Sequence, residues 1–174
     1  MPRDSRKTWM LVLIVAVAAL ASGIGTAFWV FNKDRPALAT ERQAAVVERG
    51  ADVMGFDPDA TVHRFAPTGT GGIEEVTARD ARDREEIVEV RAHLRGEVDS
   101  WRRGDFSAPA TIHGEDMPGL ETLMFAGNTL AVDYTPLPDG ARVTFASNDA
   151  DVVAALHAWF EAQLSDHGAD AERG

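Results

Sequence analysis

The fold is decided by residues 130–145, whose sequence is LAVDYTPLPDGARVTF. Apolar residues alternate with polar or small ones from Leu130 to Tyr134, and again from Val143 to Phe145. Alternation with a period of two is typical of a strand that buries one face. Pro138-Asp139-Gly140 lies between the two runs and favours a tight turn. The stretch therefore predicts a β-hairpin.

Two similar blocks of the chain each hold such a pair of strands followed by a helix. In the first block, strands over 61–66 and 73–79 flank a glycine-rich turn, and 80–103 carries apolar residues at three- and four-residue steps. In the second block, a helix with the same periodicity follows an N-cap at Asn148 or Asp149.

Two helices that each bury one stripe need a shared apolar surface, and one face of a sheet supplies it. We therefore predict an α+β domain over 58–167 with the order ββαββα. Its expected core is a four-stranded antiparallel sheet with both helices on one face.

A long apolar run lies near the N-terminus. Residues 9–31 form a stretch of 23 residues without a charge, enough for an α-helix to cross a hydrocarbon core of roughly 30 Å. A cleaved signal peptide would have a shorter apolar region, of about 7–15 residues. The sequence therefore predicts a single transmembrane helix over 9–31, a preceding cytoplasmic segment over 1–8, a connector over 32–57 and a flexible tail over 168–174.

The basic residues Arg3, Arg6 and Lys7 precede the apolar run. The positive-inside rule then favours a cytoplasmic N-terminus and a periplasmic C-terminal domain at a bacterial inner membrane. Small residues at four-residue spacing within the run favour close packing against a second helix in lipid. They are Ala19, Ala21, Ser22, Gly23, Gly25 and Thr26. The lipid bilayer and integral membrane protein subunits are therefore the expected partners.

Composition excludes several classes of protein. The chain lacks cysteine, which excludes disulfides, thiolate metal sites and a cysteine nucleophile. Its net charge is −11, and an acidic chain repels phosphate backbones, so nucleic acid is not an expected partner. No serine-nucleophile elbow, phosphate loop or His-Glu-x-x-His motif occurs, so the chain is not expected to be an enzyme.

All five histidines lie in the predicted exported domain, and they are His63, His93, His113, His157 and His167. In a chain without cysteine, imidazole is the natural ligand for copper or zinc. Glu89, His93 and Glu97 also form a row at four-residue steps on one predicted helix. Such a row either binds a metal or pairs with neighbouring arginines. The histidines are therefore candidate metal ligands, and structural or surface roles are the alternative.

The connection over 105–128 is a second candidate site. It contains two prolines and a short predicted helical turn near 120–125. We expect its apolar residues to form an exposed contact surface for a partner protein. They are Phe106, Met117, Leu120 and Phe125.

Short motifs are scattered over residues 54–167. They are Met54-Gly55-Phe56-Asp57, Thr61-Val62-His63-Arg64-Phe65, Arg91-Ala92-His93-Leu94, Gly104-Asp105-Phe106 with Pro109, Ile112-His113-Gly114, Pro118-Gly119, Leu156-His157-Ala158-Trp159-Phe160 and Asp166-His167. Together they resemble a family of small uncharacterised bacterial proteins that are sometimes labelled aspartate carbamoyltransferase. The enzyme label does not fit this chain, which has no carbamoyl-phosphate loop of the Ser-Thr-Arg-Thr type.

The resemblance implies no established reaction. It does imply that the five histidines occupy recurring family positions, which favours metal binding. The family often has a His-His pair where this chain has His63-Arg64. Its members are usually soluble, so the apolar N-terminal run would be an addition.

Three functional hypotheses follow. The leading one is a non-enzymatic, membrane-anchored accessory subunit whose acidic domain binds or stabilises a larger respiratory, photosynthetic or transport complex. The second is a membrane-tethered protein that binds copper or zinc through histidine. The third is an enzyme with a carboxylate–histidine site, which requires a concave pocket holding both groups. The positions of the five imidazoles in space discriminate among them.

Overall fold

The computed structural model describes residues 35–174, of which 42–174 belong to one compact unit. Among the described residues, none of the helices has the length and apolar composition of a membrane span. The predicted transmembrane helix over 9–31, with its small-residue packing face, lies outside the described part of the chain. The membrane-spanning element of the predicted fold is therefore not supported by the structure.

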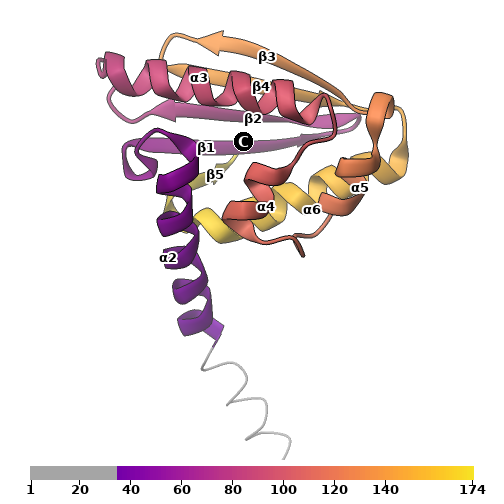
Figure 1. Ribbon diagram of the computed structural model, residues 1–174, viewed down its shortest axis with the longest axis horizontal. Coiled ribbons are helices and arrows are strands. Elements are labelled where there is room, and N and C mark those ends of the chain that lie inside the picture. The colour runs from indigo at the N-terminus through magenta and orange to yellow at the C-terminus, as the bar shows by residue number, and fades with distance from the viewer. Residues whose placement is uncertain (1–34) are drawn as a thin grey trace, which may run out of the picture. The chain divides into compact units, whose positions relative to one another are not determined.

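The domain is an α+β fold built on a five-stranded sheet with the strand order β3-β4-β2-β1-β5 (Figure 1). The strands are β1 (Thr61–Thr68), β2 (Gly71–Ala78), β3 (Ala131–Leu137), β4 (Gly140–Ala146) and β5 (Ala171–Arg173). The first four pair antiparallel, as two hairpins joined along β2 and β4, whereas β5 runs parallel to β1. The α+β class is confirmed.

The predicted four-stranded antiparallel sheet was wrong, because residues expected to form a C-terminal tail add a fifth, parallel strand. β5 is three residues long, too short to show a period-two pattern. It pairs with the edge of β1, where the Gly174 amide donates to the Phe65 carbonyl at 2.9 Å and Arg64 pairs with Glu172 at 3.0 Å. The strand depends on a partner far along the chain, which local sequence does not reveal.

The described part of the chain holds five α-helices, which are α2 (Arg35–Met54), α3 (Arg84–Trp101), α4 (Ser107–His113), α5 (Leu120–Phe125) and α6 (Ala150–His167). Short 3-10 turns precede β1, β3 and β5, at Pro58–Ala60, Gly127–Thr129 and Gly168–Asp170. The helices α3 and α6 pack on the sheet, and α5 packs against α6 (Figure 1). The predicted order ββαββα therefore lacks the helices α2, α4 and α5 and the strand β5.

Local sequence explains where the long helices begin and end. At the start of α3, Asp83 accepts a hydrogen bond from the Glu86 amide at 3.1 Å. At the start of α6, Asp149 accepts one from the Asp151 amide at 2.9 Å. Both are N-caps, which satisfy amides that have no partner within the helix. The helix α2 ends where Gly55 adopts a φ of +71°, a conformation that glycine tolerates best.

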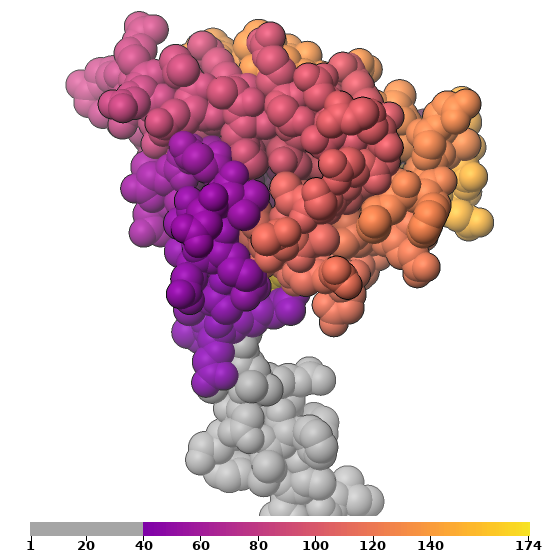
Figure 2. Space-filling model, in the orientation of Figure 1, coloured from indigo at the N-terminus to yellow at the C-terminus, as the bar shows by residue number. Residues whose placement is uncertain are grey.

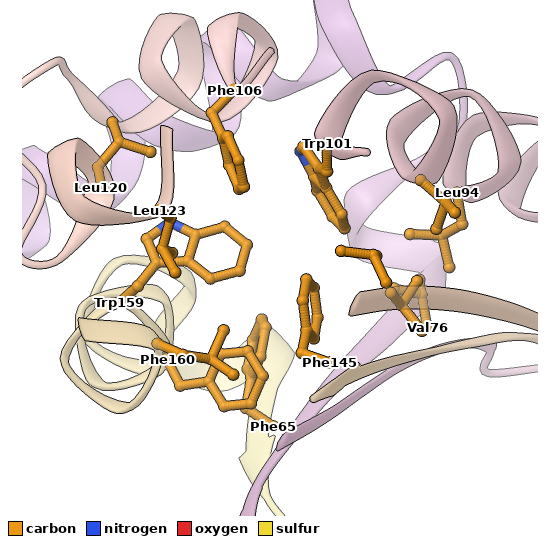
Figure 3. Packing of buried hydrophobic residues seen from close by; sticks show 14 of the residues in the cluster. Phe65, Val76, Leu94, Trp101, Phe106, Leu120, Leu123, Phe145, Trp159 and Phe160 are labelled. Atoms are coloured by element: carbon orange, nitrogen blue, oxygen red, sulfur yellow. The ribbon is translucent and has the colours of Figure 1, made fainter. Parts of the chain in front are cut away.

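Most of the core lies between one face of the sheet and the helices α3 and α6. Figure 3 shows Trp101 of α3 and Trp159 of α6 beside Phe145 of β4, and their ring centroids lie 5.5 Å and 6.0 Å from that of Phe145. Because one strand residue contacts both helices, α3 and α6 share a sheet face. The opposite face is polar, with Arg142 donating to Glu75 at 2.7 Å. Buried functional groups therefore gather on the helix-covered face.

Candidate functional site

A cavity of about 40 Å³ lies on the helix-covered side of the sheet. Four of the five histidines line it, together with two glutamates. These six residues define the histidine cavity, and they are His63 on β1, Glu74 on β2, His93 and Glu97 on α3, His113 on α4 and His167 on α6. Five separate elements therefore bring six titratable side chains into one place.

Three of the imidazole rings lie in contact. The His63 and His167 rings are stacked, with 4.6 Å between their centroids, and the His113 ring lies edge-on to His167 at 5.1 Å. The Phe56 ring reaches the fourth histidine, since its centroid lies 6.0 Å from His63 and 5.3 Å from His93. The rings of His63 and His113 thus both lie about 5 Å from that of His167.

Strand alternation explains why a histidine and a glutamate lie in the interior. On β1, His63 and Phe65 point to the helix-covered face, and on β2, Glu74 and Val76 do so. Glu74 lies directly across from Phe65 in the antiparallel register. Because successive residues of a strand face opposite sides, one of the adjacent residues Glu74 and Glu75 has to point into the core.

Helical periodicity supplies the remaining groups. His93 and Glu97 are one turn apart on α3, and Gln163 and His167 are one turn apart on α6. Because residues four apart share a helix face, each pair lines the cavity together. Of the predicted row of Glu89, His93 and Glu97 on α3, only His93 and Glu97 line the cavity.

A hydrogen-bonded chain of Arg42, Asp166 and His113 orients one imidazole. His113 Nδ1 lies 3.0 Å from Asp166 Oδ2, and Arg42 holds the same carboxylate through Nε and Nη2, the latter at 2.9 Å. Burial alone would raise the pKa of Asp166, but the hydrogen bonds from His113 and Arg42 hold it below its usual value. The ionised carboxylate accepts a proton from Nδ1, so Nε2 is the ring nitrogen of His113 that Asp166 leaves available to a ligand.

The other three imidazoles of the cavity are kept neutral by burial. It lowers the pKa of His93 to about 4 and, with a contribution from neighbouring His113, that of His167 to about 3. The pKa of His63 falls well below its usual value, first through burial and then through the adjacent imidazoles. Neutral imidazole is the form that binds metal ions, so these rings are in their ligand form at neutral pH.

The two glutamates of the cavity are shifted in the opposite direction. Burial, with a smaller contribution from Glu97, raises the pKa of Glu74 to about 8. Burial, with a smaller contribution from Asp105, raises the pKa of Glu97 to about 7. Glu74 is therefore largely protonated at neutral pH, and Glu97 is divided between its two forms. Burial therefore favours the uncharged form of His63, His93 and His167 and of both glutamates.

Buried polar atoms without a hydrogen-bond partner are concentrated around this cavity. Among the described residues seven such side-chain atoms occur, and five belong to residues that line it. They are His63 Nδ1, Glu74 Oε2, Glu97 Oε2, Trp101 Nε1 and Gln163 Oε1. The Trp101 indole lies beside Glu97 and lowers its pKa, but does not reach normal hydrogen-bond geometry. Since an unpaired buried polar atom costs roughly 1–3 kcal/mol, the concentration points to a polar guest.

The described side chains do not form a ready-made coordination sphere. No group of three or more histidine, aspartate or glutamate residues among them could hold a metal ion in its present arrangement. A metal would require the imidazoles to turn about their side-chain torsions, beginning with the stacked pair of His63 and His167. Met54 also lines the cavity and offers a soft thioether.

The fifth histidine has a structural role. His157 Nε2 lies 3.1 Å from the Thr68 carbonyl and 2.8 Å from the Gly71 carbonyl, to which it donates its proton. This contact ties α6 to the turn between β1 and β2. His157 is therefore separated from the other candidate ligands.

The residues predicted to form a partner contact are divided by the fold. Phe106, Met117 and Leu120 are buried in the core, whereas Phe125 is 81% exposed. The first three are buried because the connection between α3 and β3 folds into α4 and α5, whose apolar sides face inward. Only Phe125 of this set lies on the surface.

Sequence reasoning missed Glu74, Gln163, Asp166 and Arg42 as residues of the site. The adjacent Glu74-Glu75 pair within a strand was a usable signal, because one of the two has to be buried. Gln163 lies in the apolar stripe of α6, where a polar residue is unexpected. Arg42 and Asp166 are 124 residues apart, so no local pattern joins them.

No family model, curated protein or solved structure matches this chain. The resemblance to the small bacterial family stays a prediction. The roles of the site residues therefore rest on their geometry and chemistry.

Proposed function

We propose that this chain binds one zinc or copper ion in the histidine cavity. The observation that carries the proposal is the convergence of His63, His113 and His167, from three distant segments, on one buried cavity. Neutral imidazole is a preferred ligand of both metals. Glu74 and Glu97 can add carboxylate oxygens once their protons leave.

The contact between Asp166 and His113 supports this proposal. In metal sites, a ligating histidine usually donates its other ring N–H to a carboxylate or carbonyl, which fixes the ring and raises its basicity. His113 follows this pattern through Nδ1 and Asp166, and Arg42 in turn holds Asp166. We therefore assign His113 Nε2 as a metal-binding atom.

The size of the cavity favours an ion over an organic ligand. Its volume is about 40 Å³. Pockets for organic ligands typically measure roughly 300–1,000 Å³, whereas an ion with one or two waters needs far less. A bound ion with its waters would also give partners to the unpaired polar atoms of the cavity, which an apolar guest would not.

The proposal leaves the other two sequence-based hypotheses as predictions. The enzyme hypothesis requires a concave pocket with histidine and carboxylate groups. The histidine cavity holds both groups, but it is smaller than most substrate pockets. An accessory role in a membrane complex depends on a partner surface, which is a separate question from the cavity.

The test is equilibrium dialysis of the full-length, chelator-treated chain against Zn²⁺ and, separately, Cu²⁺, followed by metal analysis. We expect about one ion per chain, in the manner of a closed imidazole site. The His113→Gln and His167→Gln variants should each lose it. The matched control is His157→Gln, because His157 does not line the cavity and its ring nitrogen lies at the Thr68 and Gly71 carbonyls.

Circular dichroism and thermal unfolding of the metal-free variants establish that each is folded. The proposal is overturned if the native chain retains neither metal. It is equally overturned if a folded variant lacking both His113 and His167 still binds one ion, since the ligands then lie elsewhere.

A further inference from the structure

A second hollow lies on the surface of the domain, on the other side of α4. It is a groove of about 580 Å³ between α4 and α5, which form neighbouring surfaces in Figure 2. Ser107 and Thr111 of α4 line this groove, whereas Pro109 and His113 of the same helix line the histidine cavity. The groove is thus a distinct site, with residues of its own.

Apolar side chains form the floor and one wall of the groove. Phe106 and Leu120 are fully buried beneath it, and so provide a rigid floor. Among the described residues three large hydrophobic side chains are exposed, and two of them, Met124 and Phe125, line this groove. Met124 is 42% exposed and Phe125 81% exposed. Adjacent exposed apolar side chains beside a hollow are typical of a docking surface.

The rim of the groove is acidic. Asp105, Glu115 and Glu121 line it, and no lysine or arginine of the described chain does so. Within the described residues, none of these three carboxylates forms an ion pair. Asp105 instead accepts a hydrogen bond from the Ser107 amide at 3.1 Å. Glu115 and Glu121, which have no ion-pair partner among the described residues, complement a partner that brings positive charge.

We propose that this groove docks an amphipathic helical segment of a partner protein, with apolar side chains on one face and lysine or arginine at its edges. The apolar face would cover Met124 and Phe125, and the basic residues would pair with Glu115 and Glu121. An anionic lipid surface is disfavoured by the same carboxylates, because like charges repel. The site does not depend on metal binding.

The test uses fluorescence anisotropy of the full-length chain with a labelled helical peptide that has leucine on one face and lysine on the other. We expect Phe125→Ser to weaken binding roughly tenfold or more, as the loss of a central contact residue does. Val88→Ser is the matched control and should leave the affinity unchanged. Val88 is 61% exposed but lies on α3 and does not line the groove.

A second pair of variants distinguishes ion pairs at the groove from a general attraction of the basic peptide to the negatively charged chain. Glu121→Lys and Glu48→Lys change the net charge equally, but only Glu121 lines the groove. We expect Glu121→Lys to weaken binding several-fold more than Glu48→Lys. Equal effects of these two variants, or unchanged affinity in folded Phe125→Ser, would overturn the proposal. Binding to anionic vesicles that requires Phe125 would assign the groove to membranes and overturn it as well.

Discussion

Glu74 has a pKa of about 8 in the folded chain, above its ordinary value of 4.5. Between these two values the folded chain keeps a proton that the unfolded chain has lost, so the free energy of unfolding falls as the pH rises. Glutamine cannot ionise, so Glu74→Gln removes this dependence. Relative to the native chain, the variant should gain stability from about pH 5 to about pH 8, by at most about 1.4 kcal/mol per pH unit. Urea unfolding with a chelator present measures this.

Three histidines of the cavity act in the opposite direction and are present in both chains, so they cancel in the comparison. The pKa values of His63, His93 and His167 are lowered in the folded chain, and stability is therefore lost as the pH falls below about 6.5. Glu75→Gln is the control, because Glu75 lies on the same strand but faces Arg142 on the polar side of the sheet. Parallel pH profiles for the two variants would show that Glu74 is not the protonated group.

Replacement of Asp166 is the most direct test of metal binding through His113. Asp166→Asn keeps the shape of the side chain but removes the charge that holds the His113 ring. If His113 is a ligand, the affinity for Zn²⁺ should fall roughly 10- to 100-fold. Competition with a chromophoric chelator measures that affinity. The control is Glu161→Gln, which removes a carboxylate on the same helix that pairs with Arg173 at the surface; a similar loss there would rule out a specific role for Asp166.

For individual residues, the sequence identified the candidate metal ligands but did not show which of them share a site. All five histidines were candidate ligands, and four line one cavity. His93 and His157 lie in similar positions beside the apolar stripes of their helices, so helical periodicity treats them alike. Packing distinguishes them, since α3 presents His93 to the cavity whereas α6 presents His157 to the carbonyls of a turn.

The element that shapes both hollows is the connection between α3 and β3, and its packing depends on Gly119. Gly119 has a φ of +82°, and a Cβ there would lie 2.0 Å from the Ala155 carbonyl oxygen of α6. We expect Gly119→Ala to lower the free energy of unfolding by roughly 3 kcal/mol or more, from backbone strain and steric overlap together. Urea unfolding with the native chain as reference gives this value.

Gly127→Ala serves as the matched variant for that measurement. Gly127 also has a positive φ, of +54°, but a Cβ there would meet nothing within 4 Å. Its replacement should therefore cost only the backbone strain, roughly 1–2 kcal/mol. Equal costs for the two variants would mean that α5 does not pack against α6 as closely as the structure has it.

Elements with a long periodic pattern were predictable, and so was the short helix α5, which the sequence placed near 120–125. Other short elements were not. The helices α3 and α6 and the two hairpins follow from their apolar periodicity and turn residues. The helix α4 and strand β5 are seven and three residues long, and each is fixed by distant contacts. The last carbonyls of α4 accept hydrogen bonds from Arg49 and Arg42 of α2, at 2.7 Å and 3.0 Å. Such contacts leave no signature in the local sequence.

For the whole molecule, binding of a metal in the histidine cavity is coupled to folding of the chain. Its residues come from β1, β2, α3, α4 and α6, so the cavity exists only when all five elements are assembled. A ligand that binds only the folded chain stabilises it in proportion to RT ln(1 + [L]/Kd). Free histidines of the unfolded chain also bind metal weakly, which reduces the gain.

We therefore expect Zn²⁺ at about 100 times its dissociation constant to raise the free energy of unfolding by up to about 2.7 kcal/mol. A His63→Leu/His167→Leu variant should not gain this increment, although apolar replacement of buried imidazoles can itself stabilise the metal-free chain. His157→Gln should gain it in full, because its ring lies outside the cavity. Urea unfolding with and without Zn²⁺ compares the three chains. An increment that persists in the double variant would place the metal outside the cavity, and its absence from the native chain would mean that the buried imidazoles pack without binding zinc.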